Sequence, residues 1–300
     1  MRCFVWWALL LSLCGVLRAV EPVHLPGIEN AFDLGSGVWS GGAPVGDAAF
    51  AELARRGVKT IVSVDGARPD VAAARRAGLR TIHLPFGYDG IPTHLTAALA
   101  KLATTETAPI FIHCHHGKHR GPAAAAILCT ARAGWSAAQG EAWLREAGTS
   151  PDYPGLYRSV REFRLPAPEA LAQVVAAFPE TTPAPPLVNA MVAIDQIFDA
   201  LKAARNRGWS NPPEDAATLL GEHFRELHRA EASAELRLGF SGAEQAAAAL
   251  REALREPGAA ARLEVAWTQV AARCTDCHRE HRNSVTRGPS IRALDFTRRD

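Results

Sequence analysis

The chain has 300 residues and a formal net charge of +2 at neutral pH. Hydrophobic residues make up 48% of it and charged residues 21%, which is the balance of a globular protein and excludes a largely disordered one. This length accommodates two domains of ordinary size. The low net charge provides no strong basic field, so the composition speaks against nucleic acid as a partner.

The first residues have the pattern of an export signal. Arg2 supplies a positive charge, and residues 3–17 are almost continuously apolar, a run too short for a comfortable membrane span. The small residue Ala19 offers a cleavage point. We therefore expect residues 1–19 to be a signal peptide and the mature protein to be periplasmic or otherwise exported. An uncleaved membrane anchor is the alternative.

The pattern from 38 to 163 alternates strand-like and helix-like stretches. Short apolar, β-branched runs predict strands at 60–64, 79–84 and 110–113, and helical patterns occupy 47–56, 70–77 and 94–104. This order predicts an α/β domain, with a mainly parallel sheet flanked by helices, over residues 20–164.

A proline-rich stretch at 165–186 is expected to be a semi-rigid linker, with one short helical piece at 169–177. After it the pattern is purely helical. Apolar residues recur at helical spacing over four segments, with breaks at 208–213, 239–242 and 257–258. The pattern predicts an all-α four-helix bundle within a second domain at 187–300.

Cysteine usage argues against a disulfide scaffold. Of six cysteines, Cys3 and Cys14 fall in the expected signal peptide. The other four are Cys114, Cys129, Cys274 and Cys277. Cys129 lies in the middle of a helical, apolar run and is expected in the core. Each of the remaining three needs a chemical explanation.

The strand expected at 110–113 leads directly into a cysteine loop, residues 114–120, and then into a helical run. A strand, a short loop and a helix N-terminus form an anion cradle, because loop N–H groups and the helix dipole converge there. Gly117 lets the loop bend. The guanidinium of Arg120 can donate hydrogen bonds to two phosphate oxygens, and its positive charge can stabilise a thiolate at Cys114. The pattern therefore indicates attack by Cys114 on a phosphate ester.

The segment from His113 to Arg120 resembles the H-C-x-x-G-x-x-R signature of the protein tyrosine and dual-specificity phosphatase superfamily. The resemblance covers about residues 36–164. It implies hydrolysis of a phosphorylated protein or a small phosphate ester through a cysteinyl-phosphate intermediate. It also implies a general acid on a separate loop, for which Asp89 is the candidate and Asp65 the weaker one. A purely turn-forming Asp89 is the alternative.

Gly121 departs from this family, which usually has Ser or Thr directly after the arginine to aid release of the thiolate. The departure is compatible with slow hydrolysis of the intermediate. It is also compatible with a module that binds phosphate without efficient turnover. A sulfur-carrier cysteine, as in rhodanese-like domains, is a third interpretation.

Four histidines in and beside the loop invite a metal-site interpretation: His113, His115, His116 and His119. No obvious carboxylate completes such a site in the sequence. We therefore expect the loop to bind phosphate and to form an electropositive rim. The expected phosphate-binding residues are His115, His116, Gly117, Lys118, His119 and Arg120.

Near the C-terminus, Cys274, Cys277 and His278 form the C-x-x-C-H pattern of c-type haem attachment. On a helix the three side chains project to one side, so two thioethers and an iron-ligating imidazole reach one haem. A redox C-x-x-C, or a zinc site completed in part by His281, is the alternative. Haem c is attached outside the cytoplasm, in agreement with the export signal.

Residues 187–283 resemble the cytochrome c-prime and c-556 family. This resemblance implies a haem bundle for electron transfer or for redox or gas sensing, with a redox partner and often a homodimer. It also implies a sixth iron position that is either open or filled by a first-helix methionine. Met191 is the candidate, with a plain core role as its alternative, and His223 and His228 are weaker candidates. The leading hypothesis is an exported phosphatase fused to a haem domain. The alternative is a haem protein whose phosphate module is weakly active or inactive.

Overall fold

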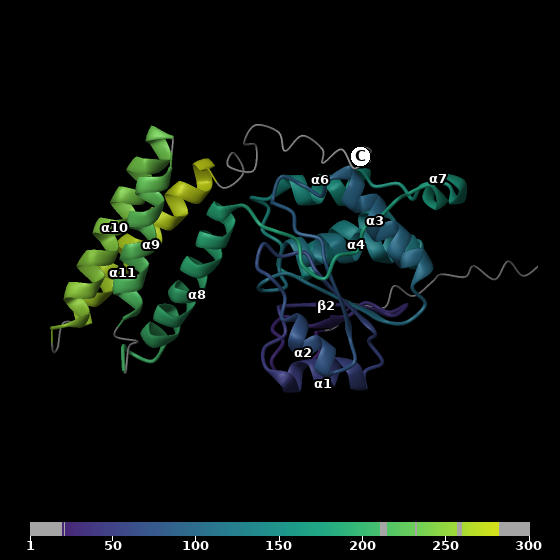
Figure 1. The fold of residues 1–300 in the computed structure, drawn as a ribbon, viewed down its shortest axis with the longest axis horizontal. Coiled ribbons are helices and arrows are strands. Elements are labelled where there is room, and N and C mark those ends of the chain that lie inside the picture. The colour runs from purple at the N-terminus through teal and green to yellow at the C-terminus, as the bar shows by residue number, and fades with distance from the viewer. Residues whose placement is uncertain (1–19, 21, 211–214, 232, 257–259, 282–300) are drawn as a thin grey trace, which may run out of the picture.

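A computed structural model describes residues 20, 22–210, 215–231, 233–256 and 260–281. It contains a part built around a β-sheet and a part built from long helices (Figure 1). The expected signal peptide at 1–19, the expected break at 257–258 and the last residues of the chain lie outside the described residues. In the ranges given, no helix has the length and apolar character needed to cross a membrane.

The sheet has five strands in the order β1-β2-β5-β3-β4. Their bounds are β1 Phe32–Asp33, β2 Val38–Gly41, β3 Thr60–Ser63, β4 Arg80–His83 and β5 Ile110–His113. All neighbours are parallel except β1, which is antiparallel to β2. The expectation of a mainly parallel sheet is confirmed. Strands β1 and β2 are additions to the predicted set. The two residues of β1 are too few for a periodic signal, and β2 contains Ser40 and Gly41 in place of a continuous apolar run.

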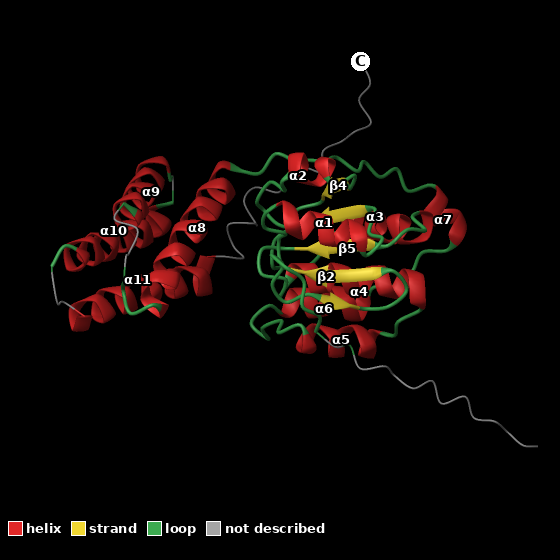
Figure 2. Ribbon diagram, turned by 90° about the horizontal axis from the view of Figure 1, so that it is seen from below, coloured by secondary structure: helices red, strands yellow, loops and turns green. Residues whose placement is uncertain are grey.

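Helices cover both faces of the sheet, as Figures 1 and 2 show. Their bounds are α1 Asp47–Arg55, α2 Val71–Arg76, α3 Thr93–Thr105, α4 Arg120–Ala133, α5 Ala137–Glu146 and α6 Pro154–Glu162. Residues of α1 and α2 form a core with one face, and residues of α3 to α6 form a larger core with the other. Burial on both faces explains why the strands read as apolar runs.

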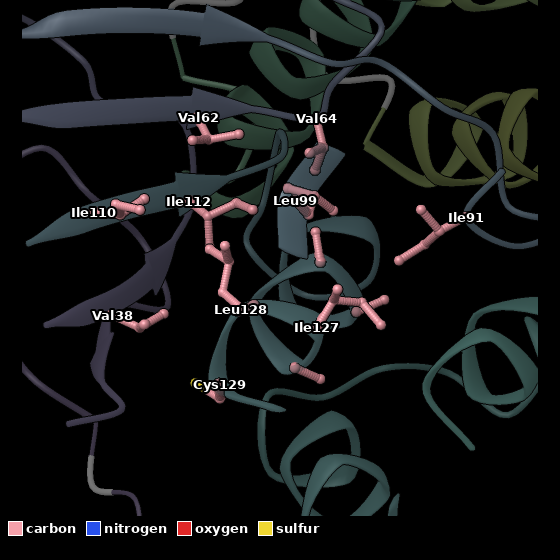
Figure 3. Close-up of a cluster of buried hydrophobic side chains, with 14 of the residues drawn as sticks. Val38, Val62, Val64, Ile91, Leu99, Ile110, Ile112, Ile127, Leu128 and Cys129 are labelled. Atoms are coloured by element: carbon pink, nitrogen blue, oxygen red, sulfur yellow. The ribbon is translucent and has the colours of Figure 1, made fainter. Parts of the chain in front are cut away.

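The larger core has strand residues such as Val62, Ile110 and Ile112 packed against Leu99 of α3 and Leu128 of α4 (Figure 3). Cys129 is fully buried in the same core, and this burial raises the pKa of its thiol. Both facts agree with the core role expected for Cys129.

The proline-rich segment is attached to the α/β part. Helix α7 (Pro168–Ala172) is shorter than the predicted piece at 169–177 and buries Leu171. The backbone N–H of His83 in β4 donates to Pro179 O (2.8 Å), and Thr182 Oγ1 donates to His83 O (2.7 Å). Strand β4 is an edge strand, so the segment covers part of the free edge of the sheet.

The second part consists of α8 (Pro186–Asn206), α9 (Ala216–Ala230), α10 (Ala234–Leu254) and α11 (Ala260–His281). Their apolar sides share one core, in which Leu201, Leu220, Leu250 and Val270 are completely buried. Phe198 of α8 stacks on Trp267 of α11, with ring centroids 4.5 Å apart.

The break expected at 239–242 is wrong, because α10 runs straight through it. A Cβ atom at Gly239 would meet Cys277 Sγ at 3.8 Å, and one at Gly242 would meet Arg273 Nε at 3.5 Å. The two glycines therefore lie on the side of α10 that faces α11. Packing between these helices outweighs the low helix propensity of glycine, about 1 kcal/mol per residue.

Candidate active site

The carboxyl ends of the parallel strands bring the candidate residues to one edge of the sheet. Cys114 follows β5, Asp65 lies just beyond β3, and the loop carrying Asp89 follows β4. This edge is where open α/β sheets bind ligands. Cys114 is 4% exposed, and Arg120 is the first residue of α4. The topology thus places the cysteine, the arginine and both candidate acids around one edge.

The loop between Cys114 and Arg120 is fixed by contacts on its outer side. Three of its carbonyl groups accept hydrogen bonds from other segments: His115 from Ala43 N (2.9 Å), Gly117 from Asn30 Nδ2 (2.9 Å) and Lys118 from Thr149 Oγ1 (2.6 Å). The described chain has no cis peptide bond. In a trans peptide group, the N–H of a residue points opposite to the carbonyl of the residue before it. The three bonded carbonyls point toward the neighbouring segments, so the N–H groups of residues 116, 118 and 119 point to the opposite side, into the loop. This orientation suits an anion cradle.

Gly117 is where the loop touches the end of β2. Its φ is +69°, and a Cβ there would lie 2.3 Å from the carbonyl carbon of Gly41 and 2.5 Å from Gly42 N. A side chain at this position meets both backbone strain and backbone atoms that cannot move aside. The loop can adopt this shape only with glycine at position 117.

Arg120 is paired with Asp65 in the interior. Arg120 Nη2 donates to Asp65 Oδ1 at 2.8 Å, and the two side chains are only 10% and 7% exposed. Burial opposes the charge on Asp65, but Arg120 together with His113 and His115 holds its pKa below the ordinary value. Asp65 is therefore an ionised carboxylate that positions the guanidinium. An acid held in this form is unsuited to protonating a leaving group.

The guanidinium of Arg120 also contacts the loop that follows β4. It lies 4.7 Å from the ring centre of Tyr88. Burial disfavours its charge, but Tyr88, Asp65 and Cys114 raise the pKa of Arg120, which places Cys114 within electrostatic reach. The Nε atom of Arg120 is buried and has no hydrogen-bond partner within the described part of the chain. A buried donor of this kind is costly unless a ligand oxygen accepts from it.

Asp89 lies half-buried in the loop after β4. Its backbone carbonyl accepts a hydrogen bond from Arg158 Nη2 (2.9 Å), and Gly155 of α6 packs directly against it. Helix α6 thus anchors the expected acid loop, a contact that no local sequence pattern signals. The role of the Asp89 side chain as the acid stays a prediction.

The four histidines of the motif have separate environments. His113 is completely enclosed, and burial lowers its pKa to about 4 despite the favourable charge of Asp65. The ring of His119 packs against Tyr153, with centroids 4.8 Å apart. His115 and His116 are half-buried, and Lys118 is exposed. The expected phosphate-binding side chains of the loop therefore do not share one environment, since three are half-buried histidines and Lys118 is exposed.

The haem-attachment residues lie on α11 of the second part. Cys274 and Cys277 are half-buried and pack against the core of α8 to α11, whereas His278 is exposed. Burial raises the pKa of Cys274 to about 11, with Cys277 and Asp195 adding to the effect. Opposite Cys277, the backbone of Gly239 leaves space that a larger side chain would fill. Two thiols and an imidazole along one helix, beside a small residue, fit covalent haem attachment.

Met191 is half-buried on α8 and packs against the same core. This position is compatible with both roles considered for it, axial ligand and core residue. His223 and His228 are half-buried on α9.

No protein-family model matches this chain, and no curated protein matches it. Solved structures with a similar fold cover about half of the chain. P. aeruginosa TpbA is 23% identical and covers 51% of this chain and 92% of its own, with a TM-score of 0.42. Human DUSP28 is 21% identical, covers 47% and 95%, and has a TM-score of 0.36. The core catalytic domain of the PP-IP phosphatase SIW14 from S. cerevisiae, in complex with citrate, is 20% identical, covers 47% and 89%, and has a TM-score of 0.40. Values this low carry no argument about activity, so the function rests on the geometry of the site itself.

Proposed function

We propose that the α/β part is a cysteine-dependent phosphatase of the protein tyrosine or dual-specificity type. One observation carries the proposal: the buried Nε donor of Arg120, within electrostatic reach of Cys114, lacks an acceptor among the described residues. A phosphate oxygen would supply that acceptor. The loop carbonyls that accept hydrogen bonds from other segments support the proposal too, because they leave the loop N–H groups directed toward a bound anion.

The reaction follows from this arrangement. The Cys114 thiolate attacks phosphorus, the bond to the leaving oxygen breaks, and Asp89 protonates that oxygen. Arg120 and the loop N–H groups bind the phosphate oxygens throughout. Asp89, now ionised, takes a proton from a water molecule that attacks the cysteinyl phosphate. The sulfur–phosphorus bond then breaks and inorganic phosphate is released.

The substrate in this proposal is a phosphorylated protein or a small phosphate ester. Both present phosphate oxygens that the buried Nε donor of Arg120 and the loop N–H groups can bind. The export signal expected at 1–19 assigns the activity to the periplasm or another exported location. A membrane anchor remains the alternative for that segment.

Gly121 is expected to make breakdown of the intermediate slow. A Cβ at this position would lie 3.4 Å from Cys114 Sγ, so a serine would place its hydroxyl beside the leaving sulfur. One hydrogen bond to the thiolate is worth about 1.5 kcal/mol, about tenfold in rate. The native chain should therefore show a burst of nearly one equivalent of p-nitrophenol from p-nitrophenyl phosphate, and Gly121→Ser should raise the steady rate about tenfold.

The matched control is Gly121→Ala, which adds the same Cβ, 3.1 Å from Cys114 N, without a hydroxyl. It should leave the steady rate unchanged or lower it. Equal acceleration by alanine and serine would refute the role given to the hydroxyl. Phosphate binding with no hydrolysis in any of the three proteins would favour the alternative function, a haem protein with an inactive phosphate module.

We further infer that α8 to α11 form a four-helix bundle carrying haem c, attached at Cys274 and Cys277 and ligated by His278. The shared core of these helices and the half-buried thiols on one helix support this proposal. Bound haem would supply electron transfer or redox or gas sensing, with Met191 as the candidate sixth ligand. A redox partner and a homodimer through the bundle belong to the same proposal.

Expression with haem-maturation machinery tests the second part. The chain should retain haem on a denaturing gel and show a c-type absorption spectrum. Changing both Cys274 and Cys277 to alanine should abolish the covalent haem, whereas Cys129→Ala, in the core of the α/β part, should retain it. His278→Ala should keep the thioethers but alter the spectrum. Absence of haem from the native chain under these conditions would overturn the assignment.

A further inference from the structure

A cluster of metal-ligating side chains lies between the phosphate loop and α8. His115 and His116 come from the loop and Asp199 from α8, and one ligand atom from each lies within 4.8 Å of the others. His115 Nε2 is 3.3 Å from Asp199 Oδ2 and 3.6 Å from Asp195 Oδ2. Asp195 and Asp199 are four residues apart on one helix, so both project to the same side.

These distances match the edges of a metal coordination shell. Zinc binds imidazole nitrogen and carboxylate oxygen at about 2.0–2.2 Å with tetrahedral geometry, which places neighbouring ligand atoms about 3.3–3.6 Å apart. The separations of 3.3 and 3.6 Å from His115 Nε2 to the two carboxylates lie at this spacing. The ring centroids of His115 and His116 are 4.2 Å apart at an interplanar angle of 76°, and a ring nitrogen of each lies within 4.8 Å of the other and of an Asp199 oxygen.

The surroundings favour a cation at this point. The other ring nitrogen of His115, Nδ1, lies 3.9 Å from the carboxyl oxygen Asp65 Oδ2. His116 Nδ1 lies 3.6 Å from Glu29 Oε2. Carboxylates behind the ligating imidazoles orient the rings and strengthen them as ligands. The cluster therefore combines two imidazoles, two facing carboxylates and two further carboxylates behind the imidazoles.

We propose that His115, His116 and Asp199 bind a divalent transition-metal ion of the zinc class, with Asp195 beside His115 as a further carboxylate. Two imidazoles and two carboxylates are ligands that zinc accepts, and a site without thiolates disfavours copper(I). The ion links the phosphate loop to α8. It also neutralises two carboxylates that would otherwise repel a phosphate ester approaching the loop.

Zinc binding to the full-length chain tests the proposal without any measurement of activity. Cys274 and Cys277 are competing thiol ligands, so the test uses the variant in which both are alanine. Equilibrium dialysis should give one tightly bound zinc per chain. Asp199→Asn and His115→Gln should each weaken binding at least about tenfold. His94→Gln, an exposed histidine on α3, should leave it unchanged.

X-ray absorption at the zinc edge provides the second readout. We expect nitrogen and oxygen neighbours near about 2.0 Å with imidazole scattering, and no sulfur near about 2.3 Å. Circular dichroism should show that both ligand variants are folded, because their side chains are partly exposed. Unchanged zinc affinity in Asp199→Asn and His115→Gln would overturn the proposal, as would sulfur coordination. Because binding is the readout, the result is independent of whether Cys114 hydrolyses phosphate esters.

Discussion

Cys114→Ser is expected to reduce the turnover of p-nitrophenyl phosphate by at least about 10³-fold. An alcohol is a far weaker nucleophile than a thiol, because it ionises much less readily. The loop and Arg120 should still bind phosphate in this variant. We therefore expect product release to disappear in both the burst and the steady phase, while inorganic phosphate or vanadate still binds.

Cys129→Ala is the matched control for this substitution. Cys129 belongs to the same helix-and-sheet unit but lies in the apolar core. Its replacement should cost about 1 kcal/mol of stability and leave turnover within about twofold of the native value. Equal activity of Cys114→Ser and the native chain would refute Cys114 as the nucleophile. Thiosulfate:cyanide sulfurtransferase activity exceeding the phosphatase activity would favour a sulfur carrier.

Arg120→Met is expected to destabilise the fold by about 3–5 kcal/mol and to abolish measurable hydrolysis. The substitution leaves the carboxylate of Asp65 buried without its cationic partner, and an unpaired buried charge carries a cost of this size. The double variant Arg120→Met with Asp65→Asn should recover much of the stability but none of the activity. Urea unfolding and the p-nitrophenyl phosphate assay measure the two effects separately.

The pH dependence of stability distinguishes this cause from simple loss of packing. In the native chain the lowered pKa of Asp65 contributes stability that is present above the ordinary carboxyl pKa and is lost as the pH falls through the lowered value. In Arg120→Met the largest interaction that opposes burial is lost, so the pKa of Asp65 should be higher than in the native chain. The difference in unfolding free energy between the two proteins should therefore shrink as the pH falls from 7 to about 4. A constant difference would contradict the charge argument.

Features that are continuous in the chain could be predicted from the sequence. Strands β3, β4 and β5 are short apolar runs, and each end of these strands in the structure lies within one residue of the predicted end. The loop from Cys114 to Arg120 was expected to join β5 to α4, and it does. Local patterns suffice here because the backbone of each feature is determined by neighbouring residues.

Contacts between distant segments could not be predicted in this way. Asp65 is the weaker acid candidate in the sequence, yet its burial beside Arg120 makes it a positioning carboxylate. The loop histidines lack a nearby carboxylate in the sequence, because Asp199 comes from a helix more than eighty residues away. The apparent break at Gly239 is misleading for the same reason, since the packing of α10 on α11 decides it.

The segment after α7, which packs along the free edge of β4, has a practical consequence for producing the α/β part alone. Ending such a fragment near residue 164, the end of the domain expected from the sequence, removes Pro179 and Thr182 from the free side of β4. Unpaired backbone groups on an edge strand recruit other chains. A fragment that ends near residue 164 is therefore expected to self-associate. A fragment extended to residue 184 keeps the contacts of Pro179 and Thr182 with β4 and should stay monomeric.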